Sequence, residues 1–541
     1  MGFVFSRPVA AAPSVAAAPT LTIRNLTITP LELKLVERLG HEHRLSKITS
    51  RITGERQSHE ASGPGEQEEL QPSSAKQTIT DAVISPFSEY HAPFYPLDPT
   101  RHHEQIRLTF EDSSTKHRYT ADIPSSSPRS IVLNPIRAPS TDLNDANDAE
   151  AETKEFAAIY LSSHSHLALF SSANLSSWMS TLPDHLALSS LSIPGTHNSP
   201  THHVALPSVR CQAVPVLEQL HNGVRFLDVR VSCPVYKPSS SSPSSTSSSP
   251  PPELALVHSA FPVSLTGPKH LSTLLETVYT FLTTHPSETI LLSLKREGTG
   301  RGSDADLARI LTQHYITPST WYTAAKIPTL AECRGRIVLV RRFHLPNSKD
   351  KDKDSELGID ASVWPDNVAD GMCGSGMVRI QDYYGVINGD GMRRKVQYVQ
   401  EGLQRAAQVV HHHHHHHHPP LQDPSGVMVT SSSTGVGEGG DGKVGGERGV
   451  EKGPAPLYIN FLSASSFFNA SCWPDRIAVK INPSIVEYLC MEHGAPGKGP
   501  GQLTVGDAAT GIVVTDWVGN NGDWGLIRCI VGWNARLLLR Q

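Results

Sequence analysis

Ionisable side chains end a succession of short apolar runs in this sequence, and their types suit acid–base chemistry at a phosphate. The set holds two histidines, three cations and four carboxylates: His197, His258, Arg230, Lys295, Arg342, Asp228, Glu297, Asp382 and Asp516. One imidazole can act as base, the other as acid, and cations can offset the charge of a phosphoryl group. A single histidine or arginine at such a position is more often structural, so the hypothesis rests on their joint occurrence.

These side chains can meet only if the apolar runs are strands of one sheet. From about residue 185, short apolar runs alternate with helical segments, a pattern typical of a βα barrel or a doubly wound sheet. Eight candidate strands lie at 188–195, 224–231, 254–258, 289–297, 336–343, 377–384, 457–465 and 511–518. Eight parallel strands close a TIM barrel, whose active site lies at the C-terminal strand ends. The sequence therefore predicts an α/β fold with a TIM-like (β/α)8 barrel over 185–541.

The segment before residue 165 has a different pattern. Apolar residues alternate at or near a two-residue period soon after residue 20, and the stretches 105–122 and 155–169 are also strand-like. We expect a small antiparallel β-sandwich-like domain over 20–165, preceded by a disordered tail at 1–19.

One helix and three inserts complete the predicted barrel. Apolar residues at helical spacing predict a helix over 268–284 that packs outside the strands. Low-complexity inserts, expected as solvated loops, lie near 237–252, 345–357 and 411–456. The last insert begins with eight consecutive histidines, and a flexible homopolymer is a poor way to fix a catalytic metal.

Composition excludes several classes of protein. A net charge of -5 supplies no basic field for a nucleic acid. No stretch approaches the roughly 20 apolar residues of a transmembrane helix, and the N-terminus lacks the positive region of a secretory signal, so we expect an intracellular protein rather than a secreted one. The seven cysteines are scattered without CxxC pairs, which indicates neither a zinc site nor a dense disulfide framework and favours buried free thiols.

The order of the motifs resembles the bacterial-type phosphatidylinositol-specific phospholipase C, or X-domain, barrel. The resemblance spans about 188–541 and includes SIPGTHNS at 192–199, LVHSAF at 256–261 and HPSETILLSLKRE at 285–297. It continues through further phrases: CQAVPVLEQLHNGVRFLDVR at 211–230, RGRIVLVRRF at 334–343, WPDN at 364–367, IQDYY at 380–384, YINFLSAS at 458–465 and VVTDW at 513–517. No single phrase is decisive, but their succession is specific.

The resemblance implies a phosphoric diester hydrolase or lyase that needs no metal or other cofactor. It would cleave phosphatidylinositol, or a glycosylated form, to diacylglycerol and inositol 1,2-cyclic phosphate. His197 would be the general base, oriented by Asp516, and His258 the general acid. Arg230, together with Lys295, would offset the charge on the phosphate oxygens.

Other positions are implied by the same resemblance. Asn198 and Asp228 belong to the catalytic set, and the substrate-binding set is Lys295, Glu297, Arg342, Trp364, Asp382 and Tyr384. A transient, interfacial contact with a phosphatidylinositol-containing membrane is implied as well, through exposed apolar side chains at the barrel mouth such as Phe261.

One residue departs from the pattern of the metal-independent enzymes. They carry aspartate after the first histidine, whereas this chain has Asn198, as calcium-dependent relatives do. In those relatives, acids that bind calcium replace the cations Arg230 and Lys295, which would repel the ion here. Two alternatives stay open: a calcium-dependent or different-substrate phosphodiesterase, with Asn198, Asp228 and Glu297 as oxygen ligands in the calcium case, and a non-catalytic head-group-binding protein.

Overall fold

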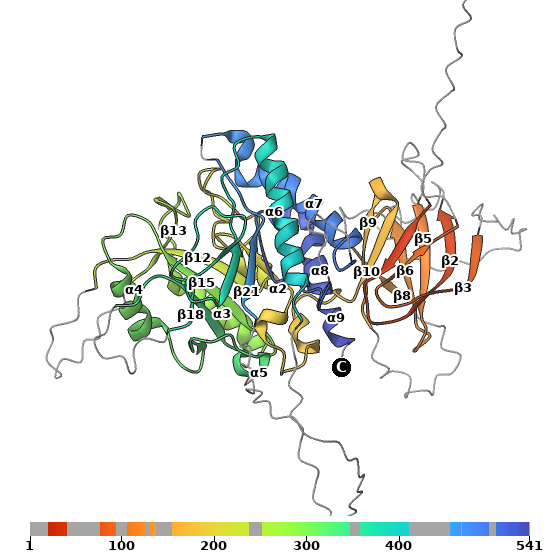
Figure 1. Cartoon of the computed structure of the whole chain (residues 1–541), viewed down its shortest axis with the longest axis horizontal. Helices are drawn as coiled ribbons and strands as arrows, with labels where there is room; N and C mark the ends of the chain where they lie inside the picture. The colour runs from red at the N-terminus through yellow and green to blue at the C-terminus, as the bar shows by residue number, and fades with distance from the viewer. Residues whose placement is uncertain are drawn as a thin grey trace, which may run out of the picture.

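The computed structural model has two groups of elements, β-strands from the N-terminal part and an α/β part (Figure 1). It describes residues 20–39, 76–93, 105–125, 130–136, 154–236, 252–346, 357–410, 455–466, 468–496 and 505–539. The predicted tail at 1–19 and nearly all of the three low-complexity inserts lie outside the described residues. The domain boundaries drawn from the sequence stay predictions.

Parallel strands form the sheet that positions the ionisable side chains. In the order of their pairing, the sheet contains β17 (Ile337–Arg342), β15 (Ile290–Arg296), β12 (Phe226–Ser232), β11 (Ile193–Thr196), β22 (Ile512–Thr515), β21 (Leu457–Phe461) and β20 (Val378–Gln381). Every neighbouring pair in this row is parallel. The strands are almost wholly buried, as expected for a parallel sheet covered by helices.

In the described residues the sheet is an open, curled barrel of parallel strands, so the predicted TIM-like barrel is confirmed in part, but not its eight-stranded closure. The apolar run at 254–258 forms β13 (Ala255–His258), which pairs antiparallel with β12 and makes a hairpin with β14 (Phe261–Pro262). Within the described part of the chain, β17 and β20 do not pair with each other. A short apolar run that ends in histidine has the same pattern in a parallel and in an antiparallel strand. The sequence therefore did not reveal the direction of β13.

Short strands continue the sheet on both sides of this opening. β16 (Trp321–Tyr322) and β18 (Ile359–Asp360) pair with β17, and β19 (Gly371–Met372) pairs antiparallel with β20. The predicted strand at 188–195 also begins later than expected, because Leu188–Ser190 is a turn of 3-10 helix. The gap between β17 and β20 is therefore spanned by the segment that contains β18 and β19.

Helices cover the outside of this sheet. The predicted helix is α3 (Leu271–Thr284), and its buried side chains lie at the expected spacing. The other helices are α2 (Val216–His221), α4 (Asp304–Ile310), α5 (Leu330–Cys333), α6 (Gly389–Ala407), α7 (Pro474–Met491), α8 (Gly525–Gly532) and α9 (Ala535–Leu538). None of the helices in the described residues is both long and apolar enough to cross a bilayer.

Two five-stranded sheets in the N-terminal part share one hydrophobic cluster. The first contains β4 (Ser88–His91), β1 (Thr22–Asn25), β10 (His166–Phe170), β9 (Ala157–Leu161) and β7 (Ser130–Val132). The second contains β3 (Lys76–Ile84), β2 (Leu31–Leu39), β5 (Gln105–Asp112), β6 (Arg118–Ile123) and β8 (Asn134–Ile136). The pairing departs from the predicted antiparallel arrangement at one place, because β1 and β10 run parallel.

The first of these sheets packs on the helices of the α/β part. Phe170 of β10 lies in the same hydrophobic cluster as Ile530 of α8. The buried guanidinium of Arg24, on β1, donates to the backbone carbonyls of Cys490 (2.9 Å) and His493 (3.1 Å) at the end of α7. The two parts are therefore joined by apolar packing and by a buried cation that satisfies free carbonyls at a helix end.

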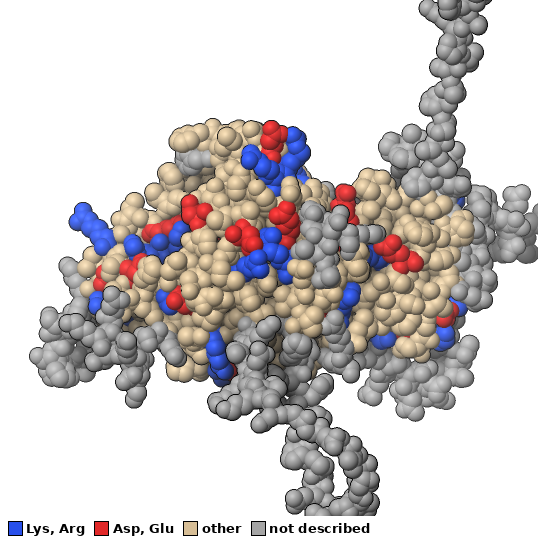
Figure 2. Space-filling view, viewed as in Figure 1, with Lys and Arg blue, Asp and Glu red and all other residues tan. Residues whose placement is uncertain are grey.

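The distribution of charged side chains and the state of the cysteines agree with what the sequence led us to expect. On the face seen in Figure 2, the Lys/Arg and Asp/Glu side chains of the described residues are interspersed. All seven cysteines lie in the described residues, and all are buried and free.

A buried ion pair connects the N-terminal end of β12 to that of its neighbour β15. The side chains of Arg225 and Glu288 are fully buried, with 2.9 Å between Nε and a carboxylate oxygen. The guanidinium also donates to the carbonyls of Leu220 and Ser176, and Glu288 accepts from the backbone of Met179. These bonds connect α2, the segment before the barrel and two strands that carry site residues.

We expect Glu288→Ala to lower the free energy of unfolding by about 3–5 kcal/mol, because it leaves the Arg225 charge buried and unpaired. Chemical denaturation monitored by circular dichroism measures the loss. Glu276→Ala, at an exposed position of α3, is the control and should change little. Equal losses in both variants would contradict a special role for the buried pair.

Candidate active site

Three cations lie side by side across neighbouring strands. In the register of the sheet, Arg230 on β12 is the partner of Lys295 on β15, and Lys295 is the partner of Arg342 on β17. His197 follows β11 and Asp516 follows β22, on the other side of β12. The C-terminal ends of parallel strands thus bring together residues that are far apart in the chain.

The backbone turns sharply after both histidines and after Asp516. The residues that follow them have positive φ angles: 42° for Asn198, 53° for Ser259 and 52° for Trp517. Asparagine tolerates this left-handed region, whereas serine and tryptophan rarely adopt it. Such strain is concentrated at functional sites, where the surrounding structure holds it in place.

His197 is held at both ring nitrogens. Its Nδ1 lies 3.0 Å from a carboxylate oxygen of Asp516. Its Nε2 lies 3.0 Å from the side-chain nitrogen Nδ2 of Asn198 and 3.0 Å from a guanidinium nitrogen of Arg230. Two donors facing Nε2 require a lone pair there, so the arrangement fits a ring that is protonated at Nδ1 and free to accept a proton at Nε2.

The neighbours of His197 have opposite effects on its protonation. Burial lowers the pKa of His197, but the Asp516 carboxylate outweighs burial and raises the pKa above the ordinary histidine value. Arg230 opposes protonation at Nε2, because the two cations would then face each other at hydrogen-bond distance. Asp516 and Arg230 therefore act in opposite directions on the proton affinity of Nε2.

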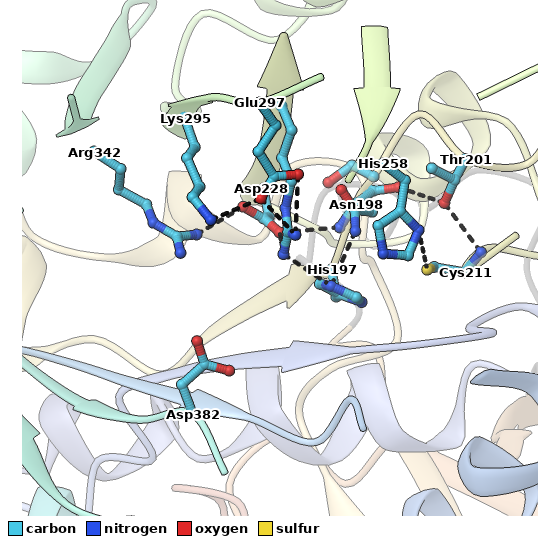
Figure 3. A network of polar contacts seen from close by, with 12 residues as sticks. His197, Asn198, Thr201, Cys211, Asp228, His258, Lys295, Glu297, Arg342 and Asp382 are labelled. Atoms are coloured by element: carbon cyan, nitrogen blue, oxygen red, sulfur yellow. Dashed lines mark hydrogen bonds and ion pairs between the residues drawn. The ribbon is translucent and has the colours of Figure 1, made fainter. Parts of the chain in front are cut away.

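Two carboxylates hold the cations in a closed network (Figure 3). Arg230 pairs with Glu297 (3.1 Å) and Asp228 (3.2 Å), Lys295 pairs with Glu297 (2.6 Å), and Arg342 pairs with Asp228 (3.1 Å). Although burial opposes it, Arg230 and Lys295 lower the pKa of Glu297 to about 2, so this group is ionised at neutral pH. Three cations against two carboxylates leave a net positive charge in the network.

His258 has a contrasting environment. Its ring lies edge-on to that of His197, with 5.7 Å between the centroids, and its Nδ1 lies 2.9 Å from the carbonyl oxygen of Val209. Burial, and then the positive charge of Arg230, lower the pKa of His258 to about 3. The two histidines therefore differ in proton affinity although they are close in space.

Trp364 bridges the opening of the barrel at the level of the site. Its Nε1 donates to Asp382, which follows β20, at 2.9 Å. The guanidinium of Arg342, at the end of β17, lies 3.7 Å from the centre of the indole ring. Side chains thus connect the two strands that the backbone leaves unpaired.

Nearly all the predicted site residues come together in this region. The exception is Tyr384, which is 41% exposed and donates to Asp366 rather than to a member of the charge network. Asp382 lies on the far side of the space from the cations (Figure 3). The structure shows where these side chains lie, whereas their catalytic and binding roles stay predictions.

Comparison with known proteins agrees with the sequence resemblance. Residues 185–343 match the family described as Phosphatidylinositol-specific phospholipase C, X domain. The 1-phosphatidylinositol phosphodiesterase of Listeria monocytogenes is 31% identical over 177 residues, which cover 31% of this chain and 49% of the relative.

A second relative and a solved structure are also similar. The 1-phosphatidylinositol phosphodiesterase of Staphylococcus aureus strain Newman is 28% identical over 265 residues, covering 46% of this chain and 74% of the relative. A solved structure of a mutant phosphatidylinositol-specific phospholipase C from Staphylococcus aureus has a TM-score of 0.46 and 21% identity, and covers 67% of this chain and 98% of that one. The chain thus spans only about half of the Listeria relative.

Two residues that contact the histidines were not predicted from the sequence. Cys211 is buried, with its Sγ 3.7 Å from Nδ1 of His258. Gln212 donates to the carbonyl of His197 at 2.8 Å and to that of Thr515 at 3.0 Å, and so fixes the turn that presents the histidine. Both lie in a quoted phrase, but neither has a spacing that indicates contact with a strand end.

A third residue that was not predicted lies beneath the site. Lys395 of α6 is fully buried and donates to Gln381 at 3.2 Å. Burial lowers its pKa to about 7, against the attraction of Asp382 and Asp516. The sequence does contain a signal, because Lys395 stands one helical turn before Val399 on the apolar face of that helix.

We expect Asp516→Asn to lower the pKa of His197, because the carboxylate stabilises the imidazolium and burial opposes it. An NMR titration of labelled histidines measures the change, and His197→Gln assigns the resonance. Asp366→Asn, which removes the acceptor of the exposed Tyr384 hydroxyl, is the control. An unchanged His197 titration in Asp516→Asn would show that this carboxylate does not set the basicity.

Proposed function

We propose that this protein cleaves the glycerophosphate ester of phosphatidylinositol, or of a glycosylated derivative, by histidine acid–base catalysis without metal. One observation carries the proposal: Nε2 of His197 faces donors on both sides, while Asp516 holds Nδ1, at the edge of a cationic network. The products are diacylglycerol and inositol 1,2-cyclic phosphate. The names of the Listeria and Staphylococcus relatives support this choice of substrate.

The first step uses the base that the site keeps available. Nε2 of His197 takes the proton of the inositol 2-hydroxyl, and the freed oxygen attacks phosphorus within the same head group. Asp516 stabilises the imidazolium that forms. Arg230 and Lys295 offset the negative charge on the non-bridging phosphate oxygens. Nε of Arg230 is buried and has no hydrogen-bond acceptor among the described residues.

The second proton transfer completes the reaction. As the bond from phosphorus to the glycerol oxygen breaks, His258 gives that oxygen a proton, and diacylglycerol leaves as a neutral alcohol. In the free protein the low pKa of His258 keeps its ring neutral at pH 7. A bound phosphodiester brings a negative charge that offsets the effect of Arg230, so substrate binding itself favours the protonated acid.

The hydrogen bonding of the two carboxylates supports a mechanism without calcium. Both oxygens of Asp228 accept from a guanidinium, and one also accepts from the backbone of Asn198. Both oxygens of Glu297 accept from Arg230, and they also accept from Lys295 or the backbone of Ser259. Calcium prefers six to eight oxygen ligands, and here it would have to displace cations to reach these two acids.

The remaining members of the site suit the inositol ring. Glu297, Arg342 and Asp382 present acceptors and donors on opposite sides of the space, which can hold ring hydroxyls. Trp364 lines the same space between Arg342 and Asp382. Tyr384 lies at the rim, where its exposed ring can stack on the sugar face.

Membrane contact can use apolar side chains next to this rim. Val204 and Leu265 are 68% and 62% exposed, and the backbone nitrogen of Leu265 donates to the carbonyl of Val204. Their loops follow His197 and His258, so they flank the two histidines. The predicted contact, Phe261, is half-buried, which makes these two neighbours better candidates for a transient contact with a lipid surface.

The proposed function is tested with phosphatidylinositol vesicles, following diacylglycerol and inositol 1,2-cyclic phosphate with excess chelator and separately with calcium. We expect cyclic product under chelator and a loss of about 10²- to 10⁴-fold in kcat for His197→Ala, the usual contribution of a general base. His344→Ala, an exposed histidine beyond the end of β17, is the control.

Each contrary result points to a stated alternative. Product that forms only with calcium would assign Asn198 to a metal site. No product under either condition would favour a head-group-binding protein. Activity that survives His197→Ala would contradict the proposed mechanism.

A double substitution tests the membrane contact. Val204→Asp with Leu265→Asp is expected to weaken sedimentation with phosphatidylinositol vesicles by about tenfold or more, because charge on these side chains cannot enter the interface. Val132→Asp, on the exposed side of β7 in the N-terminal part, is the control. Unchanged vesicle binding in the double variant would move the contact elsewhere.

A further inference from the structure

We propose that His197, Cys211 and His258 form a binding site for a thiophilic divalent cation such as Zn²⁺, and that this cation blocks the acid–base pair. The inhibitory consequence rests on the proposed function, whereas the binding site does not. One ligand atom from each of the three residues lies within 4.8 Å of the others. Figure 3 shows the thiol of Cys211 beside His258, with His197 nearby.

The three ligand types match the chemistry of zinc. Zinc takes imidazole nitrogen at about 2.0–2.1 Å and thiolate sulfur at about 2.3 Å in tetrahedral sites. Ligand atoms around such an ion are roughly 3.3–3.6 Å apart by that geometry. The longest of the present separations, up to 4.8 Å, has to contract by roughly 1.2–1.5 Å when the metal binds. Three protein ligands leave the fourth position for water, as in catalytic zinc sites.

The surroundings of His197 favour metal binding at Nε2. Asp516 accepts from Nδ1, and a histidine that ligates zinc commonly donates its other ring N–H to a carboxylate. The thiolate of Cys211 and the carboxylate of Asp516 together balance the charge of a divalent cation. Arg230 must give up its contact with Nε2 when the metal binds.

This site discriminates between zinc and calcium. It offers nitrogen and sulfur ligands, whereas calcium binds oxygen. The oxygen donors nearby, Asp228 and Glu297, are already paired with cations. We therefore expect zinc to inhibit by occupying the nitrogens that move protons, and calcium to leave this site empty.

Cobalt(II) gives a direct test, because a cysteine ligand produces a thiolate-to-metal charge-transfer band that a histidine tract such as 411–418 cannot produce. The metal-free full chain is titrated with cobalt under reducing conditions. We expect the band in the wild type and in Cys233→Ser, a buried cysteine elsewhere, and its loss in Cys211→Ser. Absence of the band in the wild type, or its persistence in Cys211→Ser, would overturn the site.

A second variant tests the contribution of His197 while the Cys211 thiol is kept. Asp516→Asn keeps all three ligands but removes the carboxylate that orients His197. We expect cobalt affinity to fall about 10–100-fold, the usual effect of such a partner. An unchanged affinity would show that His197 is not a ligand.

The inhibitory consequence is measured as the ratio of phosphatidylinositol cleavage with and without Zn²⁺ within each variant. We expect inhibition of the wild type that a chelator reverses, and little zinc sensitivity in Cys211→Ser. Equal zinc sensitivity in both would refute inhibition through this site. If no variant cleaves the lipid, the proposed function fails, while the cobalt titration still decides the metal site.

Discussion

The guanidinium of Arg230 organises the whole site. It is buried at the centre of the charge network, with Asp228 and Glu297 on one side and Nε2 of His197 on the other. A buried cation is costly unless anions and hydrogen bonds surround it. Meeting that requirement fixes the two carboxylates, and the carboxylates in turn fix Lys295 and Arg342. A row of three cations, held by two carboxylates beside an imidazole, follows from this one constraint.

The two histidines differ in proton affinity because different groups reach their Nδ1 atoms, although the rings are close in space. A carboxylate reaches Nδ1 of His197, whereas a backbone carbonyl reaches Nδ1 of His258. An anion stabilises an imidazolium much more than a neutral acceptor does, particularly away from water. Environment, rather than residue type, thus separates the role of base from the role of acid.

The open side of the barrel shows how side chains can replace a missing strand. β17 and β20 do not pair in the described residues, yet Trp364 touches both Arg342 and Asp382 at their ends. The indole gives a cation a flat face and a carboxylate a donor. On the other side of the molecule, the sheet containing β1 and β10 packs on α7 and α8, so the helices behind the site also hold the N-terminal strands.

The sequence alone determined much of this protein, because local pattern is enough for some features. Apolar runs of strand length identified the seven longer parallel strands in the described part of the barrel sheet, though not the two-residue strands β16 and β18. Polar residues at the ends of the longer strands identified the charge network. Helical spacing identified α3. These features depend on periodicity and on the rule that parallel strand ends meet at one edge.

Only the tertiary structure decided which elements pair and which distant side chains touch. It turned the run at 254–258 into an antiparallel hairpin, left the barrel open, and placed Cys211 beside His258, which is 47 residues away in the chain. It also buried Lys395 below the site. Strand direction and such contacts depend on packing between segments that are remote in sequence, and local pattern contains no information about that packing.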